Sequence, residues 1–516
     1  MPLTARREGK RSRVRAAGVG LGALALAIAA IVAVSTGGDG DAPQGPNIVI
    51  VITDDQTAAG FNRRTMPFAY RALGKRGTAF TDVVVTSPLC CPARAGFLTG
   101  QYTHNHGAWS SYPQLERPRD HLAAWLRADG YRTAMVGKYL NSYDDVVSPA
   151  TEPAPGWDEW RMLMEPLSYY GYDVSVNGRR KRLGSRDRDY QTTYLNRQVI
   201  DLVERWAQGP RPFFIWYAPH APHDEKVDSR GACAGRSVPA PGDLGRFAQI
   251  DLPRPPSFDE SDVADKPQFM RRLPRLSRAE VAELEHLYRC RHASLREVDR
   301  GVEGLVEALR DSGELERTII VLTSDNGLFY GEHRLRDGKR LPYAEAVNVP
   351  LVAWIPPETA GGVAVSRVRE PVANIDLAPT LLELAGAAPC READRCRVMD
   401  GRSLAGLIRG DAEGWPADRG RLVEMRNCRY SALLAADQLV VQHFTVPPRP
   451  AQPGGCKRKQ VWERYALDDD PFQLRNAAAG RADVSGELRE RLRKLRKCAG
   501  IEGRDPAPPA GRSYCE

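Results

Sequence analysis

The sequence predicts an α/β protein, a sandwich of helices around a large, mostly parallel sheet, with a smaller α+β part near the C-terminus. Two observations lead to this prediction. Short runs of β-branched and apolar residues, typical of strands buried on both faces, alternate with longer segments of helical periodicity. Such alternation is characteristic of parallel sheets covered by helices. At 516 residues, the chain is also long enough to bury a large core.

Five apolar runs are expected to form strands of this sheet. Residues 47–52 form a continuous β-branched run, and residues 318–322 form a second run of the same kind. Both have the composition of a parallel strand that is buried on both faces. Shorter apolar runs at residues 131–136, 212–216 and 349–354 predict three more strands.

The clearest helical pattern runs from about residue 278 to residue 310. Ser277 and Glu280 have the spacing of a capping box at its start. Its apolar positions recur at intervals of three or four residues, so one face of this helix is expected to pack on the core. These positions are 281, 284, 288, 295, 298, 302, 305 and 309.

Composition divides the rest of the chain. Residues 227–275 are rich in proline, glycine and charge, and we expect them to form a long surface excursion. After about residue 390 the pattern changes to shorter strands, at residues 433–442 and 461–467, and a basic helix at residues 487–497. We therefore predict three parts, with boundaries at 1–45, 46–390 and 391–516.

The first 45 residues have the order of an export signal. Residues 1–15 carry six basic side chains and one acidic side chain, and an unbroken apolar or glycine run follows at residues 16–34. This run also reaches the length of about 20 residues that spans a bilayer, so an uncleaved membrane anchor is the alternative. We expect the chain to be exported, either secreted or held at the outer face of the cytoplasmic membrane by this segment alone.

The charge balance changes once the basic N-terminal head, residues 1–15, is counted separately. The formal net charge is +8, and five of these charges lie in residues 1–15, which leaves about +3 for the remaining 501 residues. A nucleic-acid partner would need a basic face with interleaved aromatic residues, and the sequence offers none. We therefore expect no nucleic-acid partner.

The ten cysteines can be interpreted as disulfides if the chain is exported. Cys90 and Cys91 are adjacent and stand apart from the other eight. Pairing each of these eight with its sequence neighbour predicts Cys233–Cys290, Cys390–Cys396, Cys428–Cys456 and Cys498–Cys515.

Polar side chains follow the two strongest strands. Asp54 and Asp55 come directly after the first strand, and Asp325 and Asn326 follow the strand at residues 318–322. Ligands of α/β proteins bind at the carboxyl ends of such strands, and a hard divalent cation would relieve the repulsion between adjacent carboxylates. Taken singly, each segment could instead be a helix cap or an ordinary turn. Two such strand ends in one parallel sheet would converge, which favours a metal site.

The segment Cys90-Cys91-Pro92-Ala93-Arg94 has the features of an anion site. Pro92 suits the first turn of a helix, so Cys90 is expected at a helix N-terminus. The free N–H groups there and the Arg94 guanidinium both favour an oxyanion. An unpaired thiol beside an arginine is a candidate nucleophile, and a buried cysteine pair at a helix start is the alternative.

Together with Leu98-Thr99-Gly100, this segment resembles the signature C-x-P-[S/A]-R-x-x-x-x-T-G of the type I sulfatases. The resemblance implies an alkaline-phosphatase-like sandwich over roughly residues 46–480. It further implies that Cys90 is converted to formylglycine by a formylglycine-generating enzyme, and that the hydrated aldehyde is the nucleophile. A calcium ion, with magnesium as the alternative, would be held by Asp54, Asp55, residue 90, Asp325 and Asn326.

Other basic residues match the same family. The Gly137-Lys138 segment resembles its active-site lysine motif, His220 lies in a P-H-x-P segment, and Lys339 matches the second lysine. The roles of His223 and His333 stay open: either could touch substrate, or neither. Among sulfatases the sequence looks most like N-acetylglucosamine-6-sulfatases and related glycosaminoglycan sulfatases, for example in the segments 101–106, 137–141 and 169–172.

Two positions depart from the pattern. Many sulfatases have a histidine two residues after the lysine, where this sequence has Leu140, and Ala93 replaces the commoner serine. The resemblance implies that one hydroxyl of residue 90 attacks sulfur while Arg94, Lys138 and Lys339 neutralise charge. His220 or Lys339 would protonate the leaving alcohol, and the second hydroxyl would expel sulfate.

The expected substrate is therefore a sulfate monoester on a small molecule or a sugar. The alternatives are a phosphate or phosphonate monoester hydrolase of the same superfamily, or an inactive glycan-binding protein of the envelope. The last alternative predicts a missing nucleophile or missing metal ligands, and the sequence retains all of them.

Overall fold

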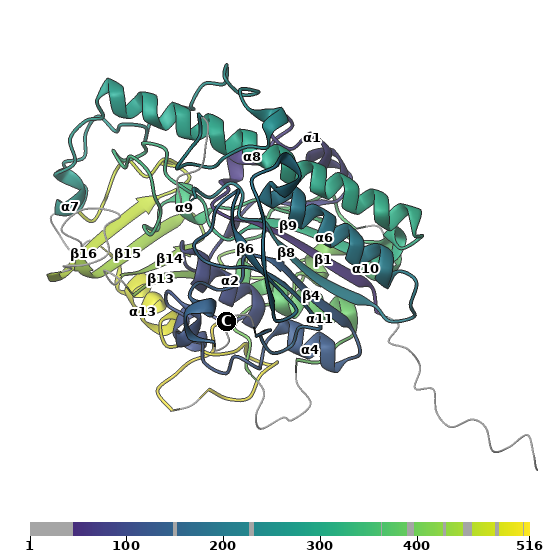
Figure 1. Cartoon of the computed structure of the whole chain (residues 1–516). Coiled ribbons are helices and arrows are strands. Elements are labelled where there is room, and N and C mark those ends of the chain that lie inside the picture. Colours follow the sequence, from purple (N-terminus) through teal and green to yellow (C-terminus); the bar gives the residue numbers. More distant parts are fainter. Residues whose placement is uncertain are drawn as a thin grey trace, which may run out of the picture. The chain divides into compact units, whose positions relative to one another are not determined.

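A mixed sheet runs through the centre of the protein, and its five middle strands are parallel (Figure 1). The computed structural model describes residues 45–147, 152–225, 232–362, 364–389, 397–426, 430–446, 457–479, 484–508 and 510–516. Within these residues the sheet has ten strands, in the order β11 (Arg367–Val368), β2 (Thr78–Phe80), β10 (Leu351–Trp354), β9 (Thr318–Ser324), β1 (Asn47–Thr53), β8 (Phe213–Ala218), β4 (Arg132–Gly137), β5 (Glu159–Leu163), β6 (Asp173–Val176) and β7 (Arg179–Arg182). The predicted α/β sandwich is confirmed, with antiparallel strands added at both edges.

All five strands predicted for this sheet are present, as β1, β4, β8, β9 and β10. β10 runs antiparallel to β9, whereas β1, β4, β8 and β9 belong to the parallel centre. Of the strands in this sheet that the sequence did not reveal, β5, β6 and β7 lie next to one another at one edge, and β2 and β11 lie at the other. They are short, and β7 consists entirely of basic residues, so neither hydrophobicity nor alternation marks it.

β1 is buried along its whole length because helices cover both faces of the sheet. Its alternate residues belong to two different cores, Ile48, Ile50 and Ile52 to one and Val49 and Val51 to the other. The first core contains side chains of α2 (Cys90–Thr99), α4 (Leu122–Ala128) and α11 (Leu377–Ala385), and the second contains side chains of α6 (Gln191–Trp206) and α8 (Arg278–Asp311). The remaining α-helices within the described residues are α1 (Pro67–Ala69), α3 (Thr103–His106), α5 (Tyr143–Val146), α7 (Gln268–Arg271), α9 (Ala344–Val347), α10 (Pro357–Ala360), α12 (Ala405–Ile408) and α13 (Gly486–Leu495).

Helix α8 confirms the strongest helical prediction. It spans 34 residues, and both hydrogen bonds of the capping box are present at its start. The Ser277 hydroxyl accepts from the Glu280 N–H over 3.3 Å, and the Glu280 carboxylate accepts from the Ser277 N–H over 2.7 Å. Its apolar face packs on α6, as its spacing predicts.

The segment 227–275 is less superficial than expected. Several of its described side chains are buried, and Phe269 and Met270 belong to the same core as Ile50 of β1. Its proline and glycine content correctly indicates irregular backbone, but irregular backbone can still pack against the core.

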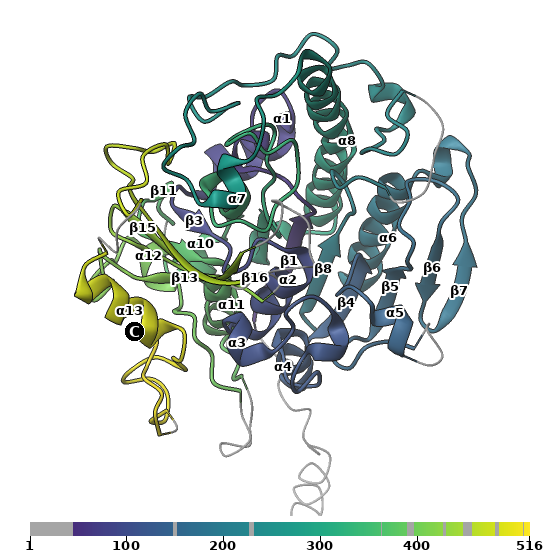
Figure 2. The same cartoon turned by 90° about the vertical axis from the view of Figure 1, so that its left-hand side faces the viewer.

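A second sheet forms the C-terminal part, next to α13 (Figure 2). It is antiparallel, in the order β13 (Arg421–Met425), β14 (Tyr430–Ala435), β15 (Gln438–Val446) and β16 (Lys457–Ala466). The prediction of one strand over residues 433–442 is wrong, because the chain turns at Ala436 and Asp437 and divides this run between β14 and β15. Ala436 adopts a φ of 48°, a conformation that the sequence does not signal because alanine rarely adopts it.

Disulfides Cys233–Cys290 and Cys498–Cys515 are formed as predicted. The other two predicted pairs, Cys390–Cys396 and Cys428–Cys456, lie outside the described residues, as does the N-terminal apolar run. Of the helices within the described residues, none combines the length and apolarity needed to cross a bilayer. Residues 43–516 form one compact unit, and a division at residue 390 stays a prediction.

Candidate active site

The two strand ends singled out in the sequence lie side by side at the carboxyl edge of the sheet. β1 and β9 pair in parallel up to Thr53 and Ser324, so Asp54 and Asp325 leave the sheet at the same level. The Asp325 N–H donates to the Thr53 carbonyl over 3.1 Å, which joins the two turns. The convergence expected from parallel pairing is therefore present.

Asp55 connects the two turns through its side chain. Its backbone φ of 66° lies in the left-handed region, which aspartate tolerates better than most residues. Its N–H donates to Asp325 Oδ1 over 3.1 Å, and its Oδ1 accepts from Asn326 Nδ2 over 2.6 Å. Asp54, Asp55, Asp325 and Asn326 are all buried, so three carboxylates and one amide share a small volume away from solvent.

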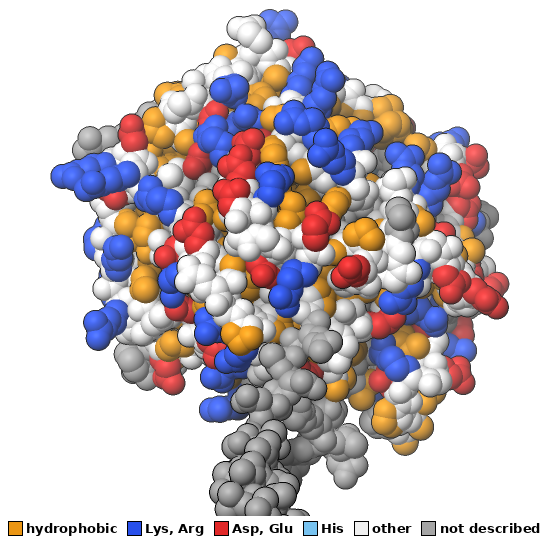
Figure 3. Space-filling view, turned by 90° about the vertical axis from the view of Figure 1, so that its right-hand side faces the viewer, with side chains coloured by type: hydrophobic (Ala, Val, Ile, Leu, Met, Phe, Trp, Pro, Cys, Tyr) orange, Lys and Arg blue, Asp and Glu red, His pale blue; other side chains and the backbone are white. Residues whose placement is uncertain are grey.

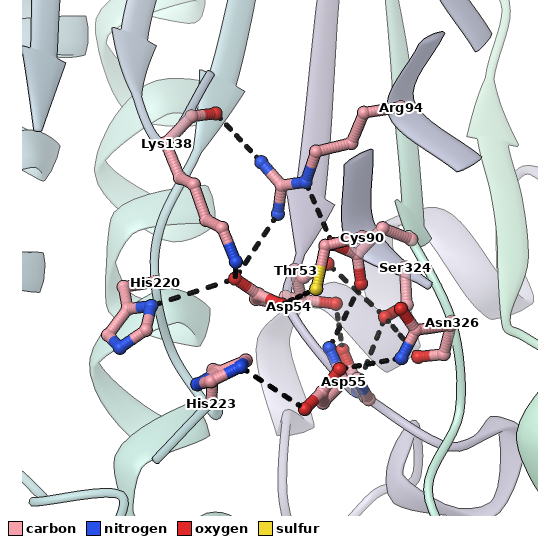
Figure 4. A network of polar contacts seen from close by, with 12 residues as sticks. Thr53, Asp54, Asp55, Cys90, Arg94, Lys138, His220, His223, Ser324 and Asn326 are labelled. Carbon is pink, nitrogen blue, oxygen red and sulfur yellow. Dashed lines mark hydrogen bonds and ion pairs between the residues drawn. The ribbon is translucent and has the colours of Figure 1, made fainter. Parts of the chain in front are cut away.

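Cys90 is the first residue of α2, and its side chain reaches this carboxylate cluster (Figure 4). Its Sγ lies 3.2 Å from Asp54 Oδ1, and the residue is 4% exposed. Pro92 occupies the first turn of the helix, as expected. Cys91 is also buried, and neither cysteine forms a disulfide. Residue 90 thus lies at a helix N-terminus, whose N–H groups favour a bound anion.

Three cationic side chains surround the cluster. The Arg94 guanidinium donates from Nε to Asp325 Oδ2 over 2.7 Å and from Nη1 to the Lys138 carbonyl over 2.7 Å. The Lys138 ammonium pairs with Asp54, and the Lys339 ammonium pairs with Asp55. Lys339 Nζ also lies 2.9 Å from Cys90 Sγ. The structure therefore brings the predicted arginine and both predicted lysines to residue 90.

The pKa values reflect this mixture of burial and charge. Burial alone would raise the pKa of Asp54, but Lys138, His223 and Arg94 together hold it well below its usual range. For Asp325 the balance is reversed, and burial together with the Asp54 charge raises its pKa to about 6. Asp325 is therefore the least stabilised of the three carboxylates, and an added cation would favour its charged form.

The unmodified thiol is unsuited to nucleophilic attack. Burial, reinforced by the neighbouring Asp54 carboxylate, raises the pKa of Cys90 to about 12. A thiol must ionise to become a strong nucleophile, and at physiological pH this one stays protonated.

Two histidines, His220 and His223, lie beside the carboxylates of the cluster. His220 Nδ1 lies 3.6 Å from Asp54 Oδ2, and His223 Nε2 lies 3.7 Å from Asp55 Oδ2 (Figure 4). Both rings donate their other N–H to the Asp224 carbonyl, over 3.2 Å from His220 and 2.6 Å from His223. Burial lowers the pKa of His223 to about 3, so this ring is neutral at physiological pH. The structure thus places both histidines at the site.

Sequence reasoning missed one further cation, Arg291 of α8. It is 2% exposed, donates from Nη2 to Asp55 Oδ2 over 3.3 Å and donates from Nη1 to the Pro222 carbonyl over 3.0 Å. A signal for it exists in the sequence. The apolar series of this helix skips from residue 288 to residue 295, and residue 291 fills that gap on the buried face. A charged residue at a core position of an amphipathic helix is a candidate for a buried site.

Two positions left open by the sequence are now located. His333 is buried against Glu260, with 2.7 Å between Nδ1 and Oε2, and among the described residues its carboxylate neighbours are Glu260 and Glu345. Leu140 is part of the apolar core, so no group at that position can accept a proton. Among the described residues, His220 and His223 are the imidazoles that contact Asp54 and Asp55.

The cluster has the composition of a site for a hard divalent cation. Asp54, Asp55, Cys90 and His223 each offer a ligand atom, and these atoms lie within 4.8 Å of one another. Asn326 Oδ1 is buried and has no hydrogen-bond partner among the described residues, as expected of an oxygen that ligates an ion. Carboxylate and amide oxygens are the ligands that calcium prefers, so these residues fit that ion.

This fold and this cluster define an α/β protein with a buried group of carboxylates and cations at the carboxyl edge of its sheet. A family model described as sulfatase matches residues 46–387, and a second, described as N-sulphoglucosamine sulphohydrolase, C-terminal, matches residues 331–498. The chain belongs to the sulfatase family.

Two curated relatives illustrate the similarity. The extracellular sulfatase SULF-1 homolog of Drosophila melanogaster is 32% identical over 389 residues, which cover 72% of this chain and 32% of the fly protein. The N-acetylglucosamine-6-sulfatase of Homo sapiens is 29% identical over 497 residues, which cover 89% of this chain and 86% of the human protein. The chain thus spans about a third of the fly relative, and 49% of a Caenorhabditis elegans homolog of the same sulfatase.

Solved structures share the fold. One is a protein in complex with its substrate, D-glucosamine-2-N,6-O-disulfate, which aligns with a TM-score of 0.68 and 22% identity over 88% of this chain and 97% of that one. Another is a phosphonate monoester hydrolase of Agrobacterium radiobacter, with a TM-score of 0.63 and 20% identity over 87% of this chain and 94% of that one. Both similarities concern the fold.

Proposed function

We propose that this protein hydrolyses sulfate monoesters on sugars, with N-acetylglucosamine 6-sulfate as the foremost candidate substrate. The observation that carries the proposal is the convergence on residue 90 of a helix N-terminus, Arg94, Lys138 and Lys339. A sulfate ester resists attack because its oxygens are negatively charged, and these cations would neutralise that charge as it grows in the transition state. The human relative named above supports the choice of sugar.

We further propose that Cys90 is converted to formylglycine by a formylglycine-generating enzyme during maturation. The buried thiol has a pKa of about 12, so it cannot serve as a thiolate. A hydrated aldehyde at this position would supply one hydroxyl for attack on sulfur and a second hydroxyl for release of sulfate.

A calcium ion, with magnesium as the alternative, would be held by Asp54, Asp55, residue 90, Asp325 and Asn326. When bound, it would polarise oxygens at residue 90 and add positive charge to the anion site. The unpartnered Oδ1 of Asn326 and the raised pKa of Asp325 support this assignment.

The remaining residues would bind the sulfate and move protons. Arg94 would hold sulfate oxygens through Nη2, which has no hydrogen-bond partner within the described part of the chain. His220 Nδ1 lacks a partner in the same sense, and its Nε2 donates to the Asp224 carbonyl. A protonated His220 would therefore present an N–H from Nδ1 to the leaving alcohol, with Lys339 as the alternative donor.

Export fits this chemistry. The disulfides Cys233–Cys290 and Cys498–Cys515 are stable in oxidising compartments, which supports an exported protein that meets its sulfated substrate outside the cytoplasm.

The test is a panel of sulfated sugars with sulfate release as the readout, together with nitrophenyl sulfate and nitrophenyl phosphate. We expect release from 6-sulfated N-acetylglucosamine and a preference for the sulfate over the phosphate ester. Preference for the phosphate ester would instead favour a phosphate or phosphonate monoester hydrolase.

Peptide mass spectrometry of the active enzyme should find formylglycine at residue 90, and an unmodified thiol there would exclude the proposed nucleophile.

A further inference from the structure

The net positive charge of the chain is concentrated in one short segment outside the N-terminal head. Residues 179–188 contain six arginine or lysine residues and one aspartate, a net charge of +5. All residues beyond the first 15 together carry only about +3. Without this segment, the remainder of the exported chain is therefore slightly acidic. Over most of the face drawn in Figure 3, basic and acidic side chains are intermixed instead.

The structure exposes every residue of this segment except Leu183, which is buried. Its first four residues form β7, the edge strand of the main sheet, and all four are exposed. Arg180 and Arg182 share a single carboxylate, Asp173, at 2.6 Å and 2.9 Å, yet their side chains stay 65% and 66% exposed. Two guanidinium groups on one carboxylate leave a surplus positive charge, so the pairing does not neutralise the strand.

Within the described residues, the other basic side chains of the segment form no ion pair. Lys181 lies over the Tyr194 ring, 5.2 Å from its centroid, and none of Arg179, Lys181, Arg186 and Arg188 pairs with a carboxylate among the described residues. Arg197 of α6 adds a further exposed cation, since its guanidinium donates to the Arg188 carbonyl. We call residues 179–188 together with Arg197 the basic strip.

Protection of the sheet edge does not account for this much charge. Edge strands commonly carry a lysine or another charge that prevents pairing with a second chain. The basic strip exceeds this need, because its charge continues past the strand into the exposed turn that carries Arg186 and Arg188.

The strip runs toward the edge of the sheet that holds the active site. β6 is antiparallel to β5, and β7 is antiparallel to β6, so β7 points the same way as β5 and the parallel centre. Its last residue therefore lies at the carboxyl edge, as Asp54 and Asp325 do. Hydrogen bonds of residues 169 and 171 also link the strip to the site. The Gly171 N–H donates to the Gly184 carbonyl in the strip, and Tyr169 Oη donates to the His223 carbonyl at the site.

The separation suits an extended ligand. β7 is five strand positions from β1 in the sheet order, as Figure 2 shows with β7 at the outer edge. At about 4.8 Å for each position, the strip lies roughly 24 Å from β1. A single sugar cannot span this distance, whereas a short stretch of polysaccharide can.

We infer that the basic strip binds an extended, sulfated polysaccharide whose terminal sugar occupies the site at residue 90. This inference rests on the proposed function for the terminal sugar, while binding at the strip can be measured separately. Guanidinium groups bind sulfate and carboxylate oxygens through paired N–H donors, and arginine is the main residue of the strip. An anionic membrane is the less suitable partner, because no described residue of the strip is an exposed large hydrophobic side chain.

The test replaces the four unpaired residues, Arg179, Lys181, Arg186 and Arg188, by serine in the full-length protein. Asp173 keeps both of its arginines in this variant. The matched control replaces four exposed arginines elsewhere, Arg63, Arg64, Arg71 and Arg76, by serine, which removes the same charge. Binding to immobilised heparin and to heparin in solution is measured at several salt concentrations, with kcat/KM on nitrophenyl sulfate as the measure of an intact site.

We expect wild-type binding to heparin to weaken with salt, and the strip variant to bind at least about tenfold more weakly than the control variant. The kcat/KM on nitrophenyl sulfate should stay unchanged in both variants, while KM on a sulfated oligosaccharide rises in the strip variant alone. Equal losses in the two variants would overturn the inference, because they would indicate a general effect of charge.

Three further outcomes bear on the inference and on the proposed function on which it rests. Binding to anionic vesicles or to RNA that matches heparin, and that the strip variant loses equally, would overturn a polysaccharide-specific role. If no sulfate ester is hydrolysed but the strip variant alone loses heparin binding, the proposed function fails and the binding site stands. If sulfate esters are hydrolysed and the strip variant binds heparin like wild type, the binding site fails alone.

Discussion

Asp54 and Glu463 are both completely buried carboxylates. They differ in how fully the polar atoms around them form hydrogen bonds within the protein. Glu463 of β16 accepts hydrogen bonds from the hydroxyls of Tyr343 and Tyr465, at 2.7 Å and 2.6 Å, and contacts His443 Nε2 at 2.6 Å. Although burial by itself raises a carboxyl pKa, these partners hold the pKa of Glu463 below its usual value. We call these four side chains the closed network.

The cluster around Cys90 is left incomplete. Arg94 Nη2, His220 Nδ1 and Asn326 Oδ1 are buried and have no hydrogen-bond partner within the residues that the structure describes. Two of these atoms are suited to donate to an anion, and the third is suited to ligate a cation. A network whose polar atoms all have protein partners stabilises the fold, whereas a network with unpartnered buried atoms has places for a ligand.

The largest expected effect concerns the residue at the centre of the incomplete cluster. Cys90→Ala and Cys90→Ser should lower kcat on a sulfate ester by roughly 10⁵-fold or more, the scale seen when a nucleophile is removed. Cys91→Ala is the matched control, since Cys91 is the neighbouring buried free cysteine, and it should retain most of the activity. If Cys91→Ala lost as much activity as the Cys90 variants, residue 90 would have no special role.

The next change compares one group from each network. Arg94→Ala should lower kcat by roughly 10²- to 10³-fold, because one preorganised donor to the developing anion is lost. Tyr465→Phe removes one donor to Glu463, and it should lower the free energy of unfolding by about 1–3 kcal/mol without changing kcat. Thermal melts and steady-state rates on both variants measure the contrast. A catalytic defect in Tyr465→Phe as large as that in Arg94→Ala would contradict the expected difference between the two networks.

Calcium should distinguish two buried asparagines. At a concentration 100 times its Kd, calcium should stabilise the wild type by about 2.7 kcal/mol, and Asn326→Ala should lose most of this increment. Asn374 is equally buried, but its side chain is fully used, since Oδ1 accepts from the Thr86 N–H and Nδ2 donates to the Ala93 carbonyl. Asn374→Ala should therefore melt at a lower temperature yet keep the increment. Differential scanning calorimetry with and without calcium decides between these outcomes.

The smallest expected effect concerns His104, whose two ring nitrogens can both donate to their neighbouring acceptors only when the ring is protonated. Nδ1 lies 2.9 Å from the Glu424 carboxylate and Nε2 lies 3.1 Å from the Cys498 carbonyl, so both ring nitrogens face acceptors. Although burial lowers its pKa, Glu424 outweighs burial and raises it from 6.5 to about 8.

Because this pKa is raised by folding, the stabilisation is complete below about pH 6.5 and is lost as the pH rises through about 8. The expected loss is about 2 kcal/mol. Melting temperatures at pH 6 and pH 9 should therefore differ more in the wild type than in His104→Gln. An equal difference in both proteins would assign the pH dependence to other groups.

Much of the fold could be predicted from the sequence because its central elements repeat one physical pattern. β1 and β9 are continuous apolar runs, and the ends of α8 follow from its capping box and its periodicity. Short edge strands could not be predicted in the same way. Their pairing depends on neighbours that are distant in sequence, and β7 has no hydrophobic residue at all.

The site was predictable as far as each residue follows a recognisable segment. Asp54 and Asp325 follow strong strands, and Cys90 precedes a helix signal, so their convergence follows from topology. Arg291 lies in the middle of a helix, where only a gap in the apolar series marks it. The partners of His223 and His333 depend on loop conformations, which residue spacing does not encode.

One consequence concerns the position next to Arg291 on α8. Cys290 is joined to Cys233, which lies in the segment that follows the two histidines of the site. A covalent bond therefore joins the residue before Arg291 to Cys233, which follows Pro222 in the sequence, and Arg291 contacts the Pro222 carbonyl. Reduction of this bond would remove this covalent restraint and leave Arg291 held by its noncovalent contacts, which include hydrogen bonds to Asp55 and to the Pro222 carbonyl. The disulfide thus adds a covalent restraint, next to the cluster around Cys90, to the hydrogen bonds that Arg291 forms.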